Sequence, residues 1–337
     1  MTKVRVGING FGRIGRCVFK HLLRDEHCEV VAVNDLAPVA DLAYLLKYDS
    51  VHGWYPEKTE STDTTLEVGG RTIPVSAERS PASIPWSDQG VDVVIESTGA
   101  FRGRAEAAAH LEAGAKRVLI SAPSDDVDAT IVLGVNTDDY DRERHRVISM
   151  ASCTTNSLAP VAKVLHDRFG IEKLLISTVH AYTASQSLMD KPARHRRRGR
   201  AAALSIIPTT TGAAKATALV IPDLEGKMDG MAFRVPVPDG SVTDIVALLG
   251  RGTSVDEVNE ALSEAAAKPP LEGILRVTEE ALVSRDIQGD PHSSIVDAQS
   301  TMVLDGNLVK VVAWYDNEWG YSSRLCDFCR VMGEQGF

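Results

Sequence analysis

The chain has 337 residues, of which 44% are hydrophobic and 24% charged, and its formal net charge is −10. This composition excludes a disordered, collagen-like or disulfide-stapled chain, and the length is typical of two domains. The acidic balance argues against a dedicated nucleic-acid binder, which usually carries a basic surplus. No segment approaches the roughly 18 consecutive apolar residues of a membrane span, and the first residues lack the apolar core of a signal peptide. We therefore expect a cytoplasmic protein that does not enter a membrane.

Strand-like and helix-like patterns alternate up to about residue 150. Apolar runs predict strands at 4–9, 29–34, 91–95 and 118–120. Helical patterns lie between them, at 14–22 and 105–113. This alternation is typical of a parallel sheet with right-handed crossovers. The pair Gly69-Gly70, between strand-like residues 65–68 and 71–75, predicts one antiparallel hairpin.

Strand-like runs dominate after about residue 170. They cover 174–179, 231–237, 242–249 and 308–314. One helix is expected over 254–267, because Ser254 and Glu257 form a capping-box pattern ahead of apolar residues with helical spacing. The closing segment from Asn317 is also helical in pattern. These features predict an α+β second domain with a mostly antiparallel sheet.

A glycine-rich motif follows the first predicted strand. Gly10, Gly12 and Gly15 form the pattern GxGxxG at the start of a helix, and Asp35 ends the second strand. The glycines permit a tight turn and the approach of a pyrophosphate to the helix N-terminus, whereas Asp35 would bind a ribose 2′-OH and repel a 2′-phosphate. The alternative is an ordinary glycine-rich turn. We predict an α/β, Rossmann-type domain that prefers NAD and whose cofactor site includes Phe11, Arg13, Ile14 and Asn34.

Cys153 stands at the start of a helical pattern that runs towards Phe169. A helix N-terminus stabilises a thiolate, so we expect the pKa of Cys153 to lie below its usual value of about 8.5. His180 ends the strand-like run 174–179 and could lower that pKa further and act as a base. Considered alone, a buried structural cysteine and a structural histidine are the alternatives.

The other four cysteines show no pattern typical of a metal or disulfide site. An odd number of widely spaced cysteines, five in all, indicates a reducing compartment. Cys326 and Cys329 have CxxC spacing, but no second Cys or His pair stands nearby. We expect them to be buried on one face of the last helix, and we predict no metal site.

Seven stretches of the sequence resemble the phosphorylating glyceraldehyde-3-phosphate dehydrogenase family. They span nearly the whole chain in the family's order, which makes a chance resemblance negligible. They cover residues 9–16, 46–53, 151–156, 180–183, 207–215, 231–241 and 314–322. The resemblance implies a cofactor domain over 1–151 and 316–337 and a catalytic domain over 152–315.

The resemblance also implies roles for single residues. Cys153 matches the nucleophile and His180 its base, while Asn317 matches the residue that fixes the nicotinamide amide and Tyr321 the ring beside it. Further positions that line the cofactor match Arg79, Ser97, Thr98, Gly99 and Ser121. The positions that hold the substrate's C3 phosphate match Thr183 and Arg234, and Arg198 is the candidate for an assisting arginine, with Arg197 one position away. The pocket for inorganic phosphate matches Ser152, Thr154, Thr211 and Gly212.

The activity implied by the resemblance is the reversible, NAD-dependent conversion of D-glyceraldehyde 3-phosphate and inorganic phosphate to 1,3-bisphosphoglycerate. Cys153 would form a hemithioacetal and then a thioester. The family also implies a homotetramer. Lys191 stands where many NAD-preferring relatives have leucine, so we expect NAD preference with weaker use of NADP. An erythrose-4-phosphate dehydrogenase is the alternative enzyme within the same chemistry.

Residues 191–200 contain six Lys or Arg. Considered alone, such a run is typical of a nucleic-acid patch or of a solvated loop. The resemblance favours a third interpretation, a loop that runs along a subunit interface beside the neighbour's adenosine. RNA binding through this loop, as a second activity, is the alternative.

Overall fold

A computed structural model describes residues 3–337 of the chain. The contacts within the chain divide it into two compact units. The first comprises Met1–Ile131, Asp138–Ala151 and Ser322–Phe337, and the second comprises Val132–Thr137 and Ser152–Tyr321. The division expected from the sequence differs at 132–137 and 316–321, whose contacts lie with the second unit.

Within residues 3–337, the first unit contains a nine-stranded sheet with the order β10-β11-β9-β8-β1-β2-β7-β6-β5. Its strands are β1 (Val4–Asn9), β2 (Cys28–Asn34), β5 (Thr59–Ser61), β6 (Thr65–Val68), β7 (Arg71–Ser76), β8 (Val93–Glu96), β9 (Arg117–Ile120), β10 (Ala129–Thr130) and β11 (Val147–Ser149). The strands from β10 to β7 are parallel, whereas β7, β6 and β5 pair antiparallel. Beside the sheet, β3 (Tyr48–Asp49) pairs with β4 (Gly53–Trp54).

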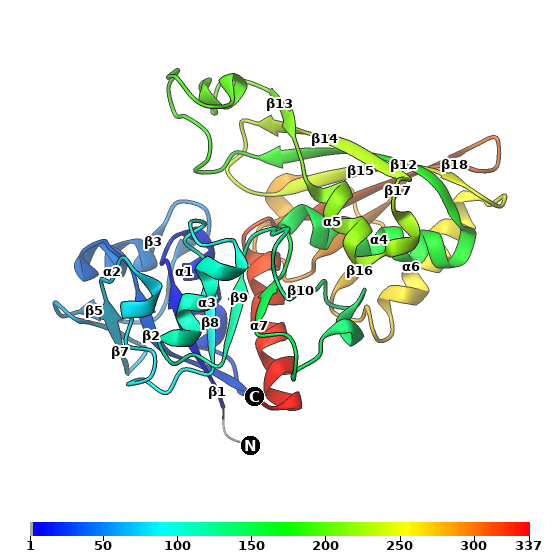
Figure 1. The fold of residues 1–337 in the computed structure, drawn as a ribbon. Coiled ribbons are helices and arrows are strands. Elements are labelled where there is room, and N and C mark those ends of the chain that lie inside the picture. Colours follow the sequence, from blue (N-terminus) through cyan, green and yellow to red (C-terminus); the bar gives the residue numbers. More distant parts are fainter. Residues whose placement is uncertain (1–2) are drawn as a thin grey trace. The chain divides into compact units, whose positions relative to one another are not determined.

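The helices of the first unit are α1 (Arg13–Leu22), α2 (Val39–Lys47), α3 (Arg104–Glu112) and, from Ser322 onward, α7 (Trp319–Gln335). Figure 1 shows α7 as the long helix at the end of the chain. It is fastened within this unit by an ion pair of Arg330 with Asp25 and by the Cys326 thiol, which lies 3.8 Å from the Val18 carbonyl on α1. Cys326 and Cys329 are both buried on α7, as the sequence predicts.

The order of the parallel strands determines where a ligand can bind. From β1 the chain passes through α1 to β2 on one side, and it later returns as β8 on the other side. The carboxyl ends of β1 and β8 therefore flank a topological switch point, the place where open α/β sheets bind ligands. This arrangement confirms the predicted Rossmann-type α/β fold.

The second unit, all of which is described, contains a seven-stranded sheet with the order β13-β14-β12-β15-β18-β17-β16. Its strands are β12 (Ile171–Ala181), β13 (Ile207–Thr210), β14 (Met228–Val235), β15 (Ser241–Leu249), β16 (Leu275–Thr278), β17 (Ser294–Leu304) and β18 (Leu308–Tyr315). Four of the six neighbouring pairs are antiparallel, which confirms a mostly antiparallel sheet. Three helices cover one face of this sheet (Figure 1), namely α4 (Cys153–Phe169), α5 (Ala213–Val220) and α6 (Val255–Ala266).

Local sequence signals account for most element boundaries. Gly69 and Gly70 both have positive φ between β6 and β7, as the predicted hairpin requires. Ser254 and Glu257 form the predicted capping box of α6. The sequence analysis did not predict the helices α2 and α5. It also missed seven further strands besides β13, namely β3, β4, β5, β10, β11, β16 and the 11-residue β17. None of the helices in the described part of the chain has both the length and the apolar character that crossing a membrane requires.

Candidate active site

The glycine-rich turn leaves the N-terminus of α1 open. Gly10 has φ of 92°, and a Cβ on Gly15 would lie 2.1 Å from the Gly10 carbonyl oxygen. Both positions therefore need glycine for the close contact of turn and helix. Gly12 is the N-cap residue of α1, and a Cβ there would meet nothing within 4 Å. This open space at unpaired helix amides fits the pyrophosphate of a dinucleotide.

Asp35 performs two tasks at the end of β2. One carboxylate oxygen accepts a hydrogen bond from the Phe11 amide at 2.7 Å, and the other accepts one from the Ala37 amide at 3.0 Å. The side chain thus fixes the glycine-rich turn from the neighbouring strand. Each oxygen keeps a further lone pair for a ribose hydroxyl, and the negative charge disfavours a 2′-phosphate. The residues present therefore fit NAD.

The remaining cofactor residues predicted in the first unit follow the same edge of the sheet. The Ser97 hydroxyl donates to the Gly10 carbonyl at 2.7 Å, while Thr98 and Gly99 are exposed. The Ser121 amide donates to the Glu96 carbonyl at 3.0 Å, and Arg79 is exposed shortly after β7. The structure therefore gathers Gly10, Gly12, Asp35, Ser97, Thr98, Gly99 and Ser121 at the carboxyl ends of β1, β2, β8 and β9.

Four predicted cofactor residues have side chains engaged elsewhere or partly buried. The ring of Phe11 is buried against Phe19, and the amide of Asn34 is buried in a hydrogen-bond network. Arg13 forms an ion pair with Asp49 at 2.8 Å, and Ile14 is half-buried. At Phe11 and Asn34, only the backbone remains to contact a ligand.

Asn317 belongs to the second unit and is held by a residue that the sequence analysis overlooked. The Ser241 hydroxyl donates to Asn317 Oδ1 at 2.6 Å and accepts from the Ala181 amide at 3.0 Å. Ser241 therefore fixes the orientation of the Asn317 amide. Tyr321 is buried near the start of α7. The sequence signal for Ser241 is its place directly after Gly240, at the first position of β15.

Cys153 is the first residue of α4, and Ser152 caps this helix by accepting a hydrogen bond from the Thr155 amide at 3.0 Å. The Cys153 Sγ lies 3.5 Å from Nε2 of His180, near the end of β12. The other ring nitrogen of His180, Nδ1, lies 2.7 Å from the Ala181 carbonyl oxygen. Because a carbonyl only accepts, Nδ1 carries the proton and Nε2 presents its lone pair to the thiol.

Burial, rather than the helix N-terminus, dominates the protonation of this pair. Burial raises the pKa of Cys153 to about 11, and the nearby Arg234 only partly opposes this. Burial and the charge of Arg234 lower the pKa of His180 to about 3. The expectation of a resting thiolate is therefore wrong. The pair rests as a neutral thiol and a neutral imidazole, because removal from water penalises the charged forms.

The candidate site for the substrate phosphate contains buried donors that no group in the described part of the chain satisfies. Arg234 Nη1 donates to the Ala181 carbonyl at 3.0 Å and to the Thr183 hydroxyl at 3.2 Å. Within the described residues, its Nε is buried without a hydrogen-bond partner. The same holds for Nε2 of Gln186, whose Oε1 accepts from the Thr183 amide. These donors fit an anion, and Gln186 is a residue that sequence reasoning missed.

The residues expected to bind inorganic phosphate lie at two helix N-termini. Ser152 caps α4, whereas Gly212 is the N-cap of α5 and makes no side-chain cap. The Thr211 hydroxyl accepts from the Ala213 amide at 3.2 Å. The Thr154 hydroxyl lies 2.9 Å from the Tyr315 hydroxyl and is buried. Thr154 therefore lacks the exposure of the other three in this structure.

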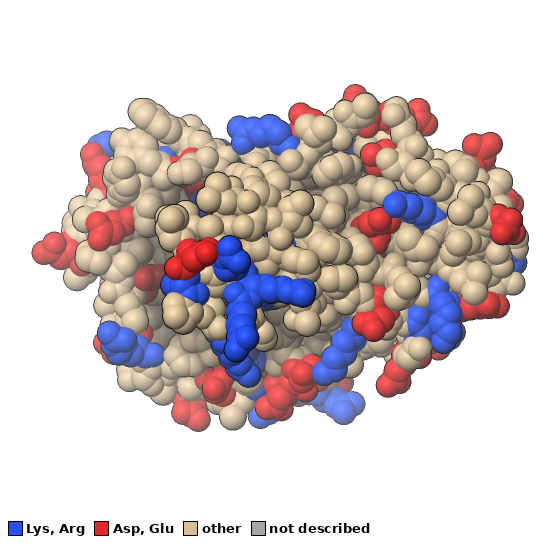
Figure 2. Space-filling view, turned by 90° about the horizontal axis from the view of Figure 1, so that it is seen from above, with Lys and Arg blue, Asp and Glu red and all other residues tan. Residues whose placement is uncertain are grey.

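Arg198 is better placed than Arg197 to assist a phosphate. Its Nε donates to the Thr209 hydroxyl at 2.9 Å, and its charge contributes to the lowered pKa values of His180 and Arg234. Arg197 is exposed. The surrounding loop exposes further cations, and Figure 2 shows a cluster of Lys and Arg side chains on the face seen from above. These exposed residues are Lys191, Arg194, Arg196 and Arg200.

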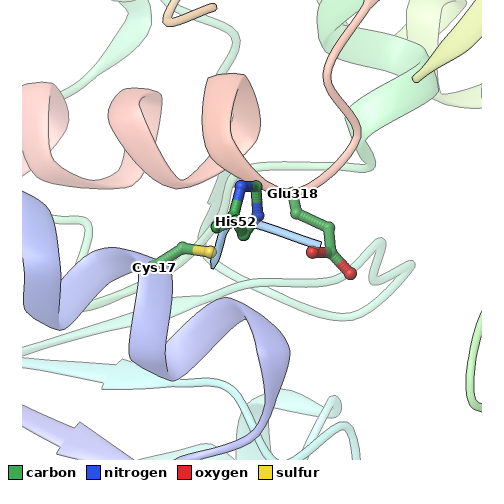
Figure 3. A group of neighbouring side chains, drawn as sticks. All are labelled: Cys17, His52 and Glu318. Carbon is green, nitrogen blue, oxygen red and sulfur yellow. The ribbon is translucent and has the colours of Figure 1, made fainter. Parts of the chain in front are cut away.

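Figure 3 shows Cys17 and His52, which belong to the first unit, together with Glu318 of the second unit. Cys17 is buried on α1, and His52 lies between β3 and β4. The first unit supplies a thiol and an imidazole here, whereas structural zinc takes four protein ligands. Within its described residues, the first unit alone thus offers no complete set of ligands at this place.

Comparisons with known proteins agree with the geometry. Residues 4–104 match the family model "Glyceraldehyde 3-phosphate dehydrogenase, NAD binding domain", and residues 152–317 match "Glyceraldehyde 3-phosphate dehydrogenase, C-terminal domain". The chain is 57% identical to glyceraldehyde-3-phosphate dehydrogenase of Geobacillus stearothermophilus over 333 residues, which cover 99% of both chains. It is 57% identical to that of Streptomyces coelicolor, covering 98% of this chain and 99% of the relative, and 55% identical to that of Priestia megaterium, covering 99% of both.

Proposed function

Since this chain belongs to the glyceraldehyde-3-phosphate dehydrogenase family, we propose that it converts D-glyceraldehyde 3-phosphate and inorganic phosphate to 1,3-bisphosphoglycerate with NAD, reversibly, as in glycolysis. The observation that carries this proposal is the pair Cys153 and His180, with Sγ and Nε2 3.5 Å apart. The hydrogen bond from His180 Nδ1 to Ala181 directs the unprotonated nitrogen at the thiol.

Substrate binding starts from the phosphate end. Arg234 offers its unpartnered Nε and Thr183 its hydroxyl to the C3 phosphate, and Gln186 offers an unpartnered amide nitrogen. Charge-assisted hydrogen bonds of this kind contribute about 1.5–3 kcal/mol each. Arg198 adds a second positive charge close to Arg234. Binding the phosphate at this end fixes the distance of the aldehyde from Cys153.

Attack on the aldehyde then requires a proton transfer within the pair. As Cys153 Sγ bonds to the carbonyl carbon, Nε2 of His180 accepts the thiol proton, which avoids an isolated buried thiolate. Nε2 then passes this proton to the former carbonyl oxygen, which becomes the hydroxyl of the hemithioacetal. When this hydroxyl is oxidised, it gives the proton back to Nε2. When bound at the glycine-rich turn and Asp35, NAD would supply the hydride acceptor for this oxidation. A thioester on Cys153 remains.

Phosphorolysis completes the reaction. Ser152, Thr211 and the amides after Gly212 hold inorganic phosphate, whose oxygen attacks the thioester carbon. Backbone amides at the start of α4 and His180 stabilise the negative oxygen that develops on that carbon. The carbon–sulfur bond breaks, the acyl phosphate leaves, and Cys153 regains its proton from Nε2 of His180.

We propose that NAD is preferred to NADP. Asp35 supports this preference, because its carboxylate would repel a 2′-phosphate. Lys191 is an exposed cation in the basic loop, so we expect weaker but measurable use of NADP. The ratio of kcat/KM for the two cofactors tests this proposal, and a preference for NADP would refute it.

We propose that the enzyme is a cytoplasmic homotetramer. The second unit leaves large apolar side chains exposed, which favours contact with a second copy of the chain. They are Leu175 at 64%, Leu188 at 78%, Met189 at 70%, Leu204 at 81% and Ile206 at 68% exposure. The catalytic thiol must also stay reduced, as it does in the cytoplasm. Analytical ultracentrifugation tests the assembly: the wild type should sediment as a tetramer, and Ile206→Glu should sediment as a smaller species.

One experiment tests the activity. Formation of NADH from glyceraldehyde 3-phosphate and NAD is followed with and without phosphate, for the wild type and for Cys153→Ser. We expect sustained turnover only for the wild type with phosphate, and a loss of at least about 10⁴-fold in the variant. Turnover without phosphate, faster with erythrose 4-phosphate, would refute the proposal. Activity in the serine variant would refute the thioester step.

A further inference from the structure

A buried carboxylate lies below the cofactor edge of the first unit. Glu96 is the last residue of β8, directly beside Asn9, the last residue of β1, and its side chain is 1% exposed. These two strands flank the switch point of the sheet. Neither the glycine motif nor the catalytic residues account for a charge at this place.

Four donors from separate groups converge on Glu96. Oε1 accepts from the Thr98 amide at 2.8 Å and from the Thr98 hydroxyl. Oε2 accepts from Asn9 Nδ2 at 2.5 Å and from His110 Nε2 at 3.1 Å. A buried carboxylate is tolerated when its oxygens are satisfied in this way.

Trp86 fixes the state of His110. The indole Nε1 of Trp86 lies 3.0 Å from Nδ1 of His110, and both side chains are fully buried. Because an indole N–H can only donate, Nδ1 must accept, and the ring proton is therefore on Nε2, facing Glu96. His110 is thus a neutral donor, and Glu96 keeps its negative charge without a neutralising cation among these four contacts.

The Glu96 carboxylate also determines which groups donate and which accept in a longer hydrogen-bond network. Since Glu96 only accepts, Asn9 must present its NH₂ group to it, and Asn9 Oδ1 accepts from Asn34 Nδ2 at 2.8 Å. Asn34 Oδ1 is then free to accept from the Ser76 hydroxyl and the Glu78 amide, each at 2.8 Å. One charge therefore determines donors and acceptors from β8 across β1 and β2 to the end of β7.

We propose that Glu96 is a positioning residue for NAD, which it holds through the loops above it rather than by contact. This inference rests on the proposed function, because the loops concerned are those assigned to the cofactor: Thr98 with its neighbours, the turn after Asn9, and the segment that leads to Arg79. In Glu96→Gln one oxygen becomes an NH₂ group. In one orientation of the new side-chain amide, its NH₂ group faces the N–H of Thr98. In the other orientation it faces the donors of Asn9 and His110, so two donors oppose each other in either case.

The test is equilibrium binding of NAD by titration calorimetry, together with KM for NAD and kcat. For Glu96→Gln we expect the Kd and KM for NAD to rise at least tenfold, while kcat at saturating NAD stays within about twofold of the wild type. Thr98→Val, which removes one of the four donors, should raise Kd by a smaller factor. This second variant keeps the proposal testable where Glu96→Gln does not fold.

Asp25→Asn is the matched control. Asp25 is also a buried carboxylate of the first unit, accepts from the His27 and Cys28 amides and pairs with Arg330, but it lies before β2, at the opposite end of the strand from Asn34. We expect this variant to lower the melting temperature without changing the Kd for NAD. Unchanged NAD binding in Glu96→Gln or in Thr98→Val, or an equal loss in Asp25→Asn, would overturn the proposal, as would a wild type that does not bind NAD. A wild type that binds NAD but oxidises no aldehyde would refute only the proposed function.

Discussion

The candidate ligand sites of the two units differ in how completely their polar groups are hydrogen-bonded. At the cofactor edge of the first unit, glycines and backbone amides form the surface, and the buried charge below it, Glu96, has four hydrogen-bond donors. In the second unit, the candidate substrate site is lined by side chains, and several of their polar atoms are buried. There Arg234 Nε and Gln186 Nε2 have no partner in the described chain, and Cys153 and His180 both have strongly shifted pKa values.

This difference follows from what each unit must do. A dinucleotide backbone stays chemically unchanged in the reaction, so the groups that hold it can be fully paired and rigid. Cys153 and His180 must transfer a proton between them, and Cys153 must form and break a bond to the substrate. Burial keeps both residues neutral, so they do not form a permanent ion pair. In the proposed function, the unpaired donors of Arg234 and Gln186 would remain available for the phosphate of the substrate.

Among the substitutions that test this difference between the units, removal of the base His180 should have the largest effect. In His180→Asn the thiol loses its proton acceptor, and we expect kcat to fall by about 10²–10⁴-fold. The amide preserves polarity and approximate size, so binding of NAD in the first unit should not change. Rapid-mixing measurement of the first turnover distinguishes slow acylation from slow product release. A variant with normal acylation would show that Cys153 is activated by another group.

Removing the charge at the phosphate end should have the next largest effect. For Arg234→Leu we expect KM for glyceraldehyde 3-phosphate to rise roughly 10- to 150-fold, the equivalent of 1.5–3 kcal/mol. Unphosphorylated D-glyceraldehyde is the control substrate, and its kcat/KM should change little. An equal loss with both substrates would show that Arg234 acts on the pair of Cys153 and His180 rather than on the phosphate.

The neutral state of His180 should be visible in stability. Its ordinary pKa of 6.5 is lowered to about 3 in the folded protein. Between these pH values the unfolded chain binds more protons at this residue, so folding is weakened as the pH falls from 6.5 towards 3. At pH 5 this costs about 2 kcal/mol. Urea unfolding at pH 7 and pH 5 should therefore show a smaller acid sensitivity in His180→Asn, and an unchanged difference would contradict the neutral imidazole.

The smallest effect is expected at Ser241, which orients Asn317. Ser241→Ala removes the hydrogen bond to Asn317 together with the one from the Ala181 amide. Loss of the bond that orients Asn317, about 1 kcal/mol, should raise KM for NAD about fivefold. Thr243→Val is the matched control, because Thr243 is a neighbouring position on the same face of β15 and its buried hydroxyl has no partner in the described chain. Equal kinetic effects of the two substitutions would show that Ser241 only contributes to packing.

The sequence predicted the fold class and the position of Cys153 at the start of a helix, because both depend on local patterns. The glycine motif, the capping box of α6 and the start of α4 at Cys153 are each visible within about ten residues of sequence. Glu96 and Ser241 escaped prediction, since their importance comes from partners such as Asn9, His110 and Asn317 that are distant along the chain. The error over the pKa of Cys153 has a related cause, because a helix N-terminus is a local feature whereas burial is not.

Asp35 constrains how this enzyme could acquire a different cofactor preference. Its carboxylate anchors the turn through the Phe11 amide, and in the proposed function it would also discriminate at the ribose. A substitution at position 35 that admits a 2′-phosphate therefore also releases the turn that receives the pyrophosphate. Engineering towards NADP consequently requires at least two changes, one at position 35 and one that restores the anchor. The same coupling makes the single-step evolutionary route to NADP costly, because the first mutant would bind either dinucleotide poorly.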